Sequence, residues 1–258
     1  LQLLKSVKDD RLKIIELSKM IDANSVQTFK KKAIEIGVNQ SNGDLIITTD
    51  GDCITPARWL QQLVHLYEIR KLKFIAAPVN FYNEKSVFQK FQSLDFTGMM
   101  LITGAGINGQ FMNMCNGANL AYDKNAFYEV GGFKGIDHLA SGDDMLLMQK
   151  IAQQFPEQIG YLKNKEATVI TKAQETIGDF FNQRIRWASK SSDYKEWKVT
   201  LTLGIVWLYC MSVFCSLFLS FIFGYSIGVL FVFLLLIKVL MDYLLLKKST
   251  LFFDRGYL

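Results

Sequence analysis

A long apolar segment near the carboxyl end constrains this chain more than any other feature. No charged residue occurs between Val199 and Ile237. A transmembrane helix needs about 20 predominantly apolar residues, so the segment is too long for one core helix of a soluble domain and long enough for two spans. We therefore predict a globular domain over residues 1–195, two transmembrane helices over residues 196–248 and a short cytoplasmic tail over residues 249–258.

Basic residues flank this segment on both sides, whereas the connection at residues 223–226 carries no charge. The flanking residues are Arg184, Arg186, Lys190, Lys195, Lys198, Lys247, Lys248 and Arg255. Because cytoplasmic segments next to spans are enriched in Lys and Arg, both flanks are predicted to be cytoplasmic. The sequence thus predicts a multi-pass protein of the cytoplasmic (inner) membrane, with membrane lipid as a partner and its globular domain in the cytosol.

Composition excludes two other classes of protein. The formal net charge is +5, but Lys and Arg are dispersed and no basic-aromatic repeat occurs, so we expect no nucleic-acid partner. The four cysteines lack CxxC spacing, which argues against a disulfide framework or a zinc site; they are Cys53, Cys115, Cys210 and Cys215.

The globular part alternates between strand-like and helix-like segments. Residues 11–17 alternate as in a strand, residues 29–36 have apolar residues on one helical face that ends at Gly37, and residues 44–49 form a β-branched strand. This β-α-β order predicts parallel strands with a right-handed crossover. Further on we expect a helix capped by Thr55-Pro56, a strand at 74–79, a helix at 86–102 broken by residues 104–106, a turn and strand at 116–122, a short helix ended by Gly131-Gly132, a helix from residue 141 and a strand at 167–171.

Two carboxylates, Asp50 and Asp52, follow the strand at residues 44–49 directly. Hard oxygen ligands two positions apart can share Mg²⁺ or Mn²⁺ with a diphosphate. The alternative is a polar strand-ending turn, because Asp-Gly is common in turns. The pair alone does not decide between the two interpretations.

A second acidic pair, Asp143 and Asp144, stands at the start of a predicted helix. One reading is a general base that removes a proton from an attacking hydroxyl. The other is structural, because Ser141-x-x-Asp144 fits a capping box and acids in a first turn are favoured by the helix dipole.

Gln183, Arg186 and Trp187 share one face of a later predicted helix. An amide, a guanidinium and an indole suit diphosphate pairing and stacking on a sugar ring. An amphipathic helix at a membrane surface would carry Arg and Trp as well. Residues 30–32, all lysine, read as a solvated helix face, although Lys31 and Lys32 could approach a phosphate.

The order of these motifs resembles the membrane-bound family 2 glycosyltransferases, related to cellulose, chitin, hyaluronan and poly-N-acetylglucosamine synthases. The resemblance covers about residues 10–240 and also includes Asn116-Gly117-Ala118-Asn119 and Gly131-Gly132-Phe133. It implies a GT-A-type (Rossmann-like) α/β fold with a mixed sheet flanked by helices, followed by a transmembrane helical hairpin. It also implies inversion at the anomeric carbon, a nucleotide-sugar donor such as a UDP-sugar, and a carbohydrate or lipid-linked acceptor in glycan synthesis.

Residue roles follow from the same resemblance. Asp50 and Asp52 match the metal-binding DxD motif, and Asp144 matches the general base, with Asp143 beside it. Donor and acceptor contacts are expected from the remaining motif residues, which are Gln183, Arg186, Trp187, Asn116, Gly117 and Asn119.

Two departures from the family pattern leave other functions open. No Val/Ile-rich strand with an acidic cluster precedes Arg11, so we expect the nucleoside-binding part to be lacking, and the acidic pair is Asp143-Asp144 where Glu-Asp is commoner. The alternatives are a non-catalytic, membrane-anchored fragment or binding subunit of such an enzyme, and a nucleotidyltransferase on a similar fold.

Overall fold

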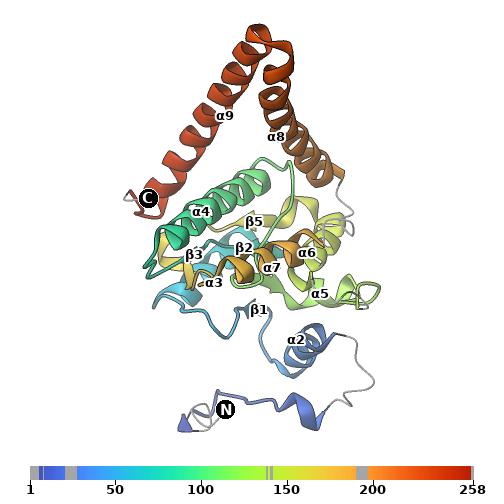
Figure 1. Ribbon diagram of the computed structural model, residues 1–258. Helices are drawn as coiled ribbons and strands as arrows, with labels where there is room; N and C mark the ends of the chain where they lie inside the picture. Colours follow the sequence, from blue (N-terminus) through green and yellow to red (C-terminus); the bar gives the residue numbers. More distant parts are fainter. Residues whose placement is uncertain are drawn as a thin grey trace.

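A small mixed sheet covered by helices forms the body of the molecule, and two long helices rise from it and meet at a tip (Figure 1). The structure is a computed structural model that describes residues 6–7, 9–20, 28–137, 139, 142–189 and 197–256. The predicted architecture, a mixed α/β sheet flanked by helices and followed by an apolar helical hairpin, is confirmed.

The main sheet has four strands, of which only one pair is parallel. Strand β4 runs antiparallel to both of its neighbours, and the outer strand β5 runs parallel to β2. Two further strands, β3 and β6, pair in parallel as a separate small sheet. In spatial order the main sheet contains β1 (Leu45–Thr48), β4 (Leu120–Asp123), β2 (Phe74–Ala76) and β5 (Ile159–Tyr161), and the small sheet β3 (Val79–Phe81) and β6 (Val169–Thr171).

Two strand predictions were wrong, and one strand was missed. Residues 12–16 form no strand and lead into a short 3₁₀ helix, η1 (Leu17–Lys19), because β1 pairs only with β4 and its other edge has no partner in the described chain. The predicted β-α-β unit with parallel strands is therefore absent there. The strand expected at 74–79 is split into β2 and β3, because Pro78 offers no N–H to a ladder and the chain changes sheets at this point. Strand β5 was not predicted.

Helices α2 to α7 belong to the globular body, and α8 and α9 form the apolar hairpin (Figure 1). In chain order the helices are α2 (Phe29–Gln40), α3 (Trp59–Arg70), α4 (Val87–Asn108), α5 (Lys124–Glu129), α6 (Asp143–Gln154), α7 (Ile177–Ala188), α8 (Trp197–Phe223) and α9 (Tyr225–Phe252), with 3₁₀ helices η2 (Pro156–Gln158) and η3 (Lys165–Ala167) around β5. Three helix boundaries, those of α2, α3 and α4, differ from the predictions. Helix α3 begins at Trp59 and not at Pro56, because Ile54 still pairs with Ile170 and the chain needs the next residues to turn.

Helix α4 continues through the glycines that were expected to end it. A Cβ on Gly104 would lie 2.7 Å from the ring of Tyr161, and one on Gly106 would lie 2.7 Å from Met112. Glycine at these positions therefore lets Tyr161 and Met112 pack closely against the helix. Helix α2 also passes Gly37 and ends three residues later, at Gln40.

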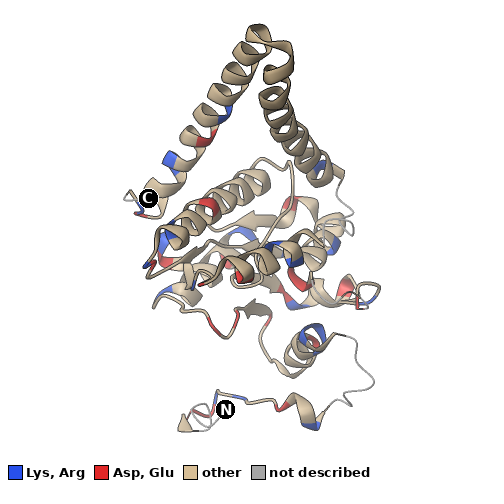
Figure 2. Cartoon of the chain, viewed as in Figure 1, with Lys and Arg blue, Asp and Glu red and all other residues tan. Residues whose placement is uncertain are grey.

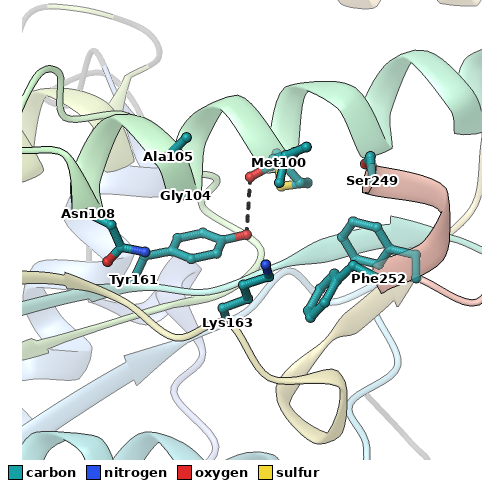
Figure 3. Close-up of a pocket in the computed structure, with 10 residues that line it drawn as sticks. Met100, Gly104, Ala105, Asn108, Tyr161, Lys163, Ser249 and Phe252 are labelled. Carbon is teal, nitrogen blue, oxygen red and sulfur yellow. Dashed lines mark hydrogen bonds between the residues drawn. The ribbon is translucent and has the colours of Figure 1, made fainter. Parts of the chain in front are cut away.

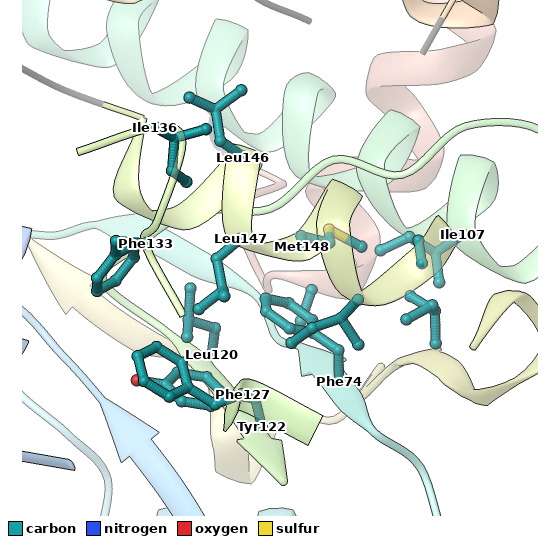
Figure 4. Close-up of a cluster of buried hydrophobic side chains, with 14 of the residues drawn as sticks. Phe74, Ile107, Leu120, Tyr122, Phe127, Phe133, Ile136, Leu146, Leu147 and Met148 are labelled. Carbon is teal, nitrogen blue, oxygen red and sulfur yellow. The ribbon is translucent and has the colours of Figure 1, made fainter. Parts of the chain in front are cut away.

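Helix α6 packs over one face of the main sheet and forms the largest buried cluster (Figure 4). Its side chains Leu147 and Met148 meet Phe74 and Tyr122 from the strands. Helix α3 covers the other face through Leu63. A third cluster, centred on Phe81 and Phe96, lies beside the small sheet and is described with the site below.

The two apolar helices, α8 and α9, contact each other, and α9 also contacts α4. Their most apolar stretches are almost entirely exposed, with 6% and 0% of the residues buried. The tip of the hairpin carries no charged side chain (Figure 2). Both helices are long and apolar enough to cross a membrane, and such an exposed apolar surface indicates membrane association.

Candidate active site

The first acidic motif lies in a turn that follows β1. The Cys53 N–H donates to the carbonyl of Asp50 at 3.2 Å, which closes this turn and leaves Asp52 exposed. Burial, together with the carboxylates of Asp52 and Asp50, raises the pKa of the Cys53 thiol. The loop thus presents two carboxylates beside a neutral thiol at the end of the strand.

Lys30, in the first turn of α2, connects this loop to the second acidic motif. Its ammonium group lies 3.0 Å from an oxygen of Asp50 and 3.3 Å from an oxygen of Asp143. Burial opposes the charge of Lys30, but the two carboxylates outweigh it and raise the pKa of the ammonium group. Reading residues 30–32 as a solvated face missed this contact. It also missed Lys31, which is buried and donates to the carbonyl of Leu139 at 2.6 Å.

The two residues of the second acidic pair contact different partners. Asp143 faces Lys30, whereas Asp144 accepts a hydrogen bond from the Gly117 N–H at 2.8 Å. The other Asp144 oxygen accepts from the Met145 N–H at the start of α6. Gly142, with φ of 82°, makes the turn into this helix. The Ser141 capping prediction and the neighbouring His138 lie outside the described residues.

The loop at residues 116–119 serves the site through its backbone. A Cβ on Gly117 would lie 3.3 Å from Asp144, so glycine lets the carboxylate approach the loop. Asn116 accepts from the Ala118 N–H within the turn. Asn119, predicted to bind a ligand, is fully buried and spans three segments: it donates to the carbonyls of Pro78 and Ala167 and accepts from the Trp59 indole. Its side chain has a framework role in this structure.

The third motif lies on α7, which begins at a Thr176 side-chain cap. Arg186 is exposed and Trp187 is partly buried, with its ring 6.1 Å from the ring of Phe96. The side-chain oxygen of Gln183 is buried and has no hydrogen-bond partner in the described part of the chain. Arg184, which lies between Gln183 and Arg186 and was not among the predicted contacts, is stacked 4.8 Å from Trp187 and pairs with Asp95 of α4.

One apolar cluster contains or contacts residues that belong to each of the three motifs or lie next to them. It has Phe81, Phe96 and Ala118 in its buried part, and Cys53 and Trp187 pack against it. Cys53 follows the first acidic motif, Ala118 belongs to the loop that holds Asp144, and Trp187 belongs to α7. The structure therefore places the motifs around one support, although they are far apart in sequence.

The residues of the first motif fit a divalent cation as partial ligands. Asp50 and Asp52 supply hard oxygen atoms, and the Lys30 ammonium shows that a positive charge is accommodated beside Asp50. Among the residues that the structure describes, no group of three or more His, Cys, Asp or Glu side chains could hold a metal. A cation here would need further ligands from a bound substrate.

The fold and these motifs have the features of an α/β transferase that carries two membrane-type helices. Residues 45–246 match the family described as Glycosyl transferase family group 2, and the chain belongs to this family. A comparison with curated proteins finds no match. The match extends from β1 through α7 and into α9, so it includes all three motifs and most of the hairpin.

Proposed function

We propose that the protein is an inverting glycosyltransferase that moves a sugar from a nucleotide-sugar donor, most simply a UDP-sugar, to a hydroxyl of a carbohydrate or lipid-linked acceptor in glycan synthesis at the membrane. The family assignment supports glycosyl transfer in general. The observation that carries the proposal is the meeting of Asp50 and Asp143 at Lys30, with Asp144 held beside them by Gly117.

The donor diphosphate is proposed to bind at the loop after β1. Asp50 and Asp52 would hold Mg²⁺ or Mn²⁺, which neutralises charge on the departing diphosphate when it is bound. Lys30 adds a fixed positive charge next to the same carboxylates. Gln183 and Arg186 are proposed to contact the diphosphate through the side-chain N–H groups of the amide and of the guanidinium, because diphosphate oxygens accept hydrogen bonds.

Asp144 is the proposed general base. The Gly117 N–H fixes one of its oxygens, so the carboxylate keeps one orientation toward an acceptor hydroxyl. Removal of that proton lets the hydroxyl oxygen attack the anomeric carbon as the bond to the diphosphate breaks. A single displacement of this kind inverts the anomeric centre. Trp187 is proposed to support the acceptor sugar by stacking.

The full chain in liposomes, supplied with a panel of nucleotide-sugars and Mn²⁺, tests this proposal. We expect release of the nucleoside diphosphate from one donor, and an Asp144→Asn rate about 10²–10⁴ times lower. Glu157→Gln, on the exposed 3₁₀ helix η2, is the matched control and should keep the wild-type rate. Turnover of Asp144→Asn within a few-fold of wild type would remove Asp144 as the base.

Two other results would change the assigned reaction. Release of pyrophosphate identifies a nucleotidyltransferase. Absence of turnover, together with absence of metal-dependent UDP binding by calorimetry, identifies a non-catalytic binding subunit or fragment.

A further inference from the structure

We propose that Arg255, which follows the second apolar helix, is a positioning residue for Trp187. Its side chain connects the end of α9 to the apolar cluster on which Trp187 rests. This inference rests on the proposed function only in taking Trp187 as the acceptor platform.

Arg255 is built into the globular domain. Its guanidinium donates to both oxygens of Glu84, at 3.0 and 2.9 Å, and also to the carbonyl of Phe81 in β3. The exposed fractions of the Arg255 and Glu84 side chains are 15% and 3%. Ser93 of α4 donates to the same carboxylate at 2.6 Å. One guanidinium nitrogen, Nη1, thus donates to both Glu84 oxygens while Nη2 donates to Phe81, and these charge-assisted hydrogen bonds restrict the position of the side chain.

Burial opposes ionisation of Glu84, but the hydrogen bond from Ser93 and the Arg255 charge outweigh it and lower its pKa. The carboxylate is therefore charged when it holds Arg255 at neutral pH. Removing either partner would leave the other charge buried and unpaired, which is strongly unfavourable.

Phe81, whose carbonyl Arg255 holds, starts a short path to Trp187. The Phe81 ring stacks on the Phe96 ring with centroids 4.6 Å apart, and the Phe96 ring lies 6.1 Å from that of Trp187. Phe253, two residues before Arg255, packs against the same cluster. Both Arg255 and Phe253 therefore act on the layer that supports the Trp187 ring.

Helix α4 connects the two ends of this path. Toward α7 it carries Asp95, which pairs with Arg184, and Gln92, which exchanges hydrogen bonds with the backbone of Gln174. Toward α9 it presents the carbonyl of Thr97, which accepts from the buried Ser249 hydroxyl. Because α4 contacts both α9 and α7, a displacement of the end of α9 would be transmitted to α7 through α4.

The contact between α9 and the domain is not packed throughout. A cavity of about 150 Å³ lies under α4, between Tyr161 and Lys163 on one side and Ser249 and Phe252 on the other (Figure 3). Because this part of the junction is not filled, the position of the helix end depends on the few specific contacts beside it. The Arg255 pair is the most buried ion pair among those found in the described chain.

Fluorine NMR of the full chain in detergent, with 5-fluorotryptophan at its four tryptophans, tests this inference without requiring activity. The Trp187 signal is assigned from the spectrum of Trp187→Phe. We expect Arg255→Gln to shift or broaden the Trp187 signal and to leave those of Trp59 and Trp207 in place. Lys165→Gln is the matched control, since it removes the exposed Lys165–Asp254 pair one residue away.

Glu84→Gln keeps the shape of the partner and removes its charge, so it should change the same signal in the same direction. It also decides the result if Arg255→Gln does not fold. An unchanged Trp187 signal in the folded variant, or an equal change in Lys165→Gln, would overturn the inference. Because the readout is structural, inactivity of the wild type would affect the proposed function and leave this test intact.

Discussion

Lys30 shows how one ammonium group can hold two acidic motifs of a site together. Its charge lies between Asp50 and Asp143, which are far apart in the sequence. A divalent cation bound by Asp50 would occupy the same electrostatic environment. Lys30 and such a cation are therefore expected to repel each other, unless a diphosphate lies between them.

Replacing Lys30 by Met is expected to tighten the binding of Mn²⁺ in the absence of nucleotide. The ammonium is about half exposed, so solvent screening limits the effect to ~1 kcal/mol, or up to about fivefold in affinity. Titration of Mn²⁺ followed by electron paramagnetic resonance measures this change. Lys32→Met is the control, because Lys32 lies on the same helix and pairs with Glu35, which belongs to neither acidic motif. Unchanged or weaker binding in Lys30→Met would contradict the repulsion.

Asp123 is expected to make the fold sensitive to acid. It accepts from the Tyr67 hydroxyl at 2.6 Å and from the Ala126 N–H that it caps, and it lies 3.3 Å from the Lys73 ammonium. Burial opposes its ionisation, but these partners outweigh it and lower its pKa below the ordinary 3.8. Burial and the same carboxylate raise the pKa of Tyr67 to about 12.

A carboxylate whose pKa is lowered by folding stabilises the folded state at pH values above its unfolded pKa, and that contribution is lost as the pH falls through the folded value. The free energy of unfolding of the wild type should therefore fall between about pH 5 and about pH 2. Asp123→Asn should be less stable at neutral pH and should show a shallower fall. Urea unfolding at several pH values measures both, with the exposed Asp10→Asn as a control. Parallel pH curves for Asp123→Asn and wild type would contradict this role.

Motifs identified candidate residues in the sequence, and tertiary contacts determined what else joins them. Asp50, Asp144 and Trp187 could be proposed from their neighbours along the chain. Lys30 could not, because its partners lie 20 residues away and beyond, at Asp50 and Asp143. The framework role of Asn119 depends on three segments that meet only in the folded protein.

At the scale of elements, replacing a helical glycine by alanine is expected to change the stability of the protein in a direction that depends on what the glycine faces. Gly104 in α4 lies against the ring of the buried Tyr161, whereas a Cβ on Gly37 in α2 would meet nothing within 4 Å. We expect Gly104→Ala to destabilise the protein by about 1–3 kcal/mol through overpacking. Gly37→Ala should be neutral or stabilising by up to about 1 kcal/mol, because alanine favours the helix. Urea unfolding compares the two, and equal effects would contradict the packing argument.

Long periodic helices could be predicted, but short strands could not. Helix α3 was expected from its apolar stripe, whereas β5 has only three residues and no such pattern. Residues 11–17 alternate like a strand but find no partner in the described chain, and the strand expected at 74–79 divides at Pro78. A strand forms only where it pairs with a strand that is distant in the sequence, so local composition alone does not predict it.

At the scale of the whole molecule, the hairpin is fixed to the domain at its base and exposed along most of its length. Thr97 and Ser249 join α4 to α9 near the base, and Lys238 pairs with Asp242 further along α9. Toward the tip the surface is apolar and uncharged (Figure 2). This distribution fits a globular domain that stays on one side of a membrane and an apolar hairpin that crosses the membrane.

The uncharged tip and the basic base predict that the two ends of the hairpin reach opposite sides of the membrane. In a variant whose four cysteines are replaced, Ser226→Cys should react with a membrane-impermeant maleimide in intact cells. Lys248→Cys, near the end of α9, should react only after the cells are permeabilised, because the basic flanks predict a cytosolic position for the adjoining domain. Labelling of Lys248→Cys but not of Ser226→Cys in intact cells would reverse the orientation, and labelling of both would show that the two ends lie on the same, outer side. Protection of both in intact cells would show that the hairpin does not cross, since a tip that stays inside reacts only when the barrier is removed.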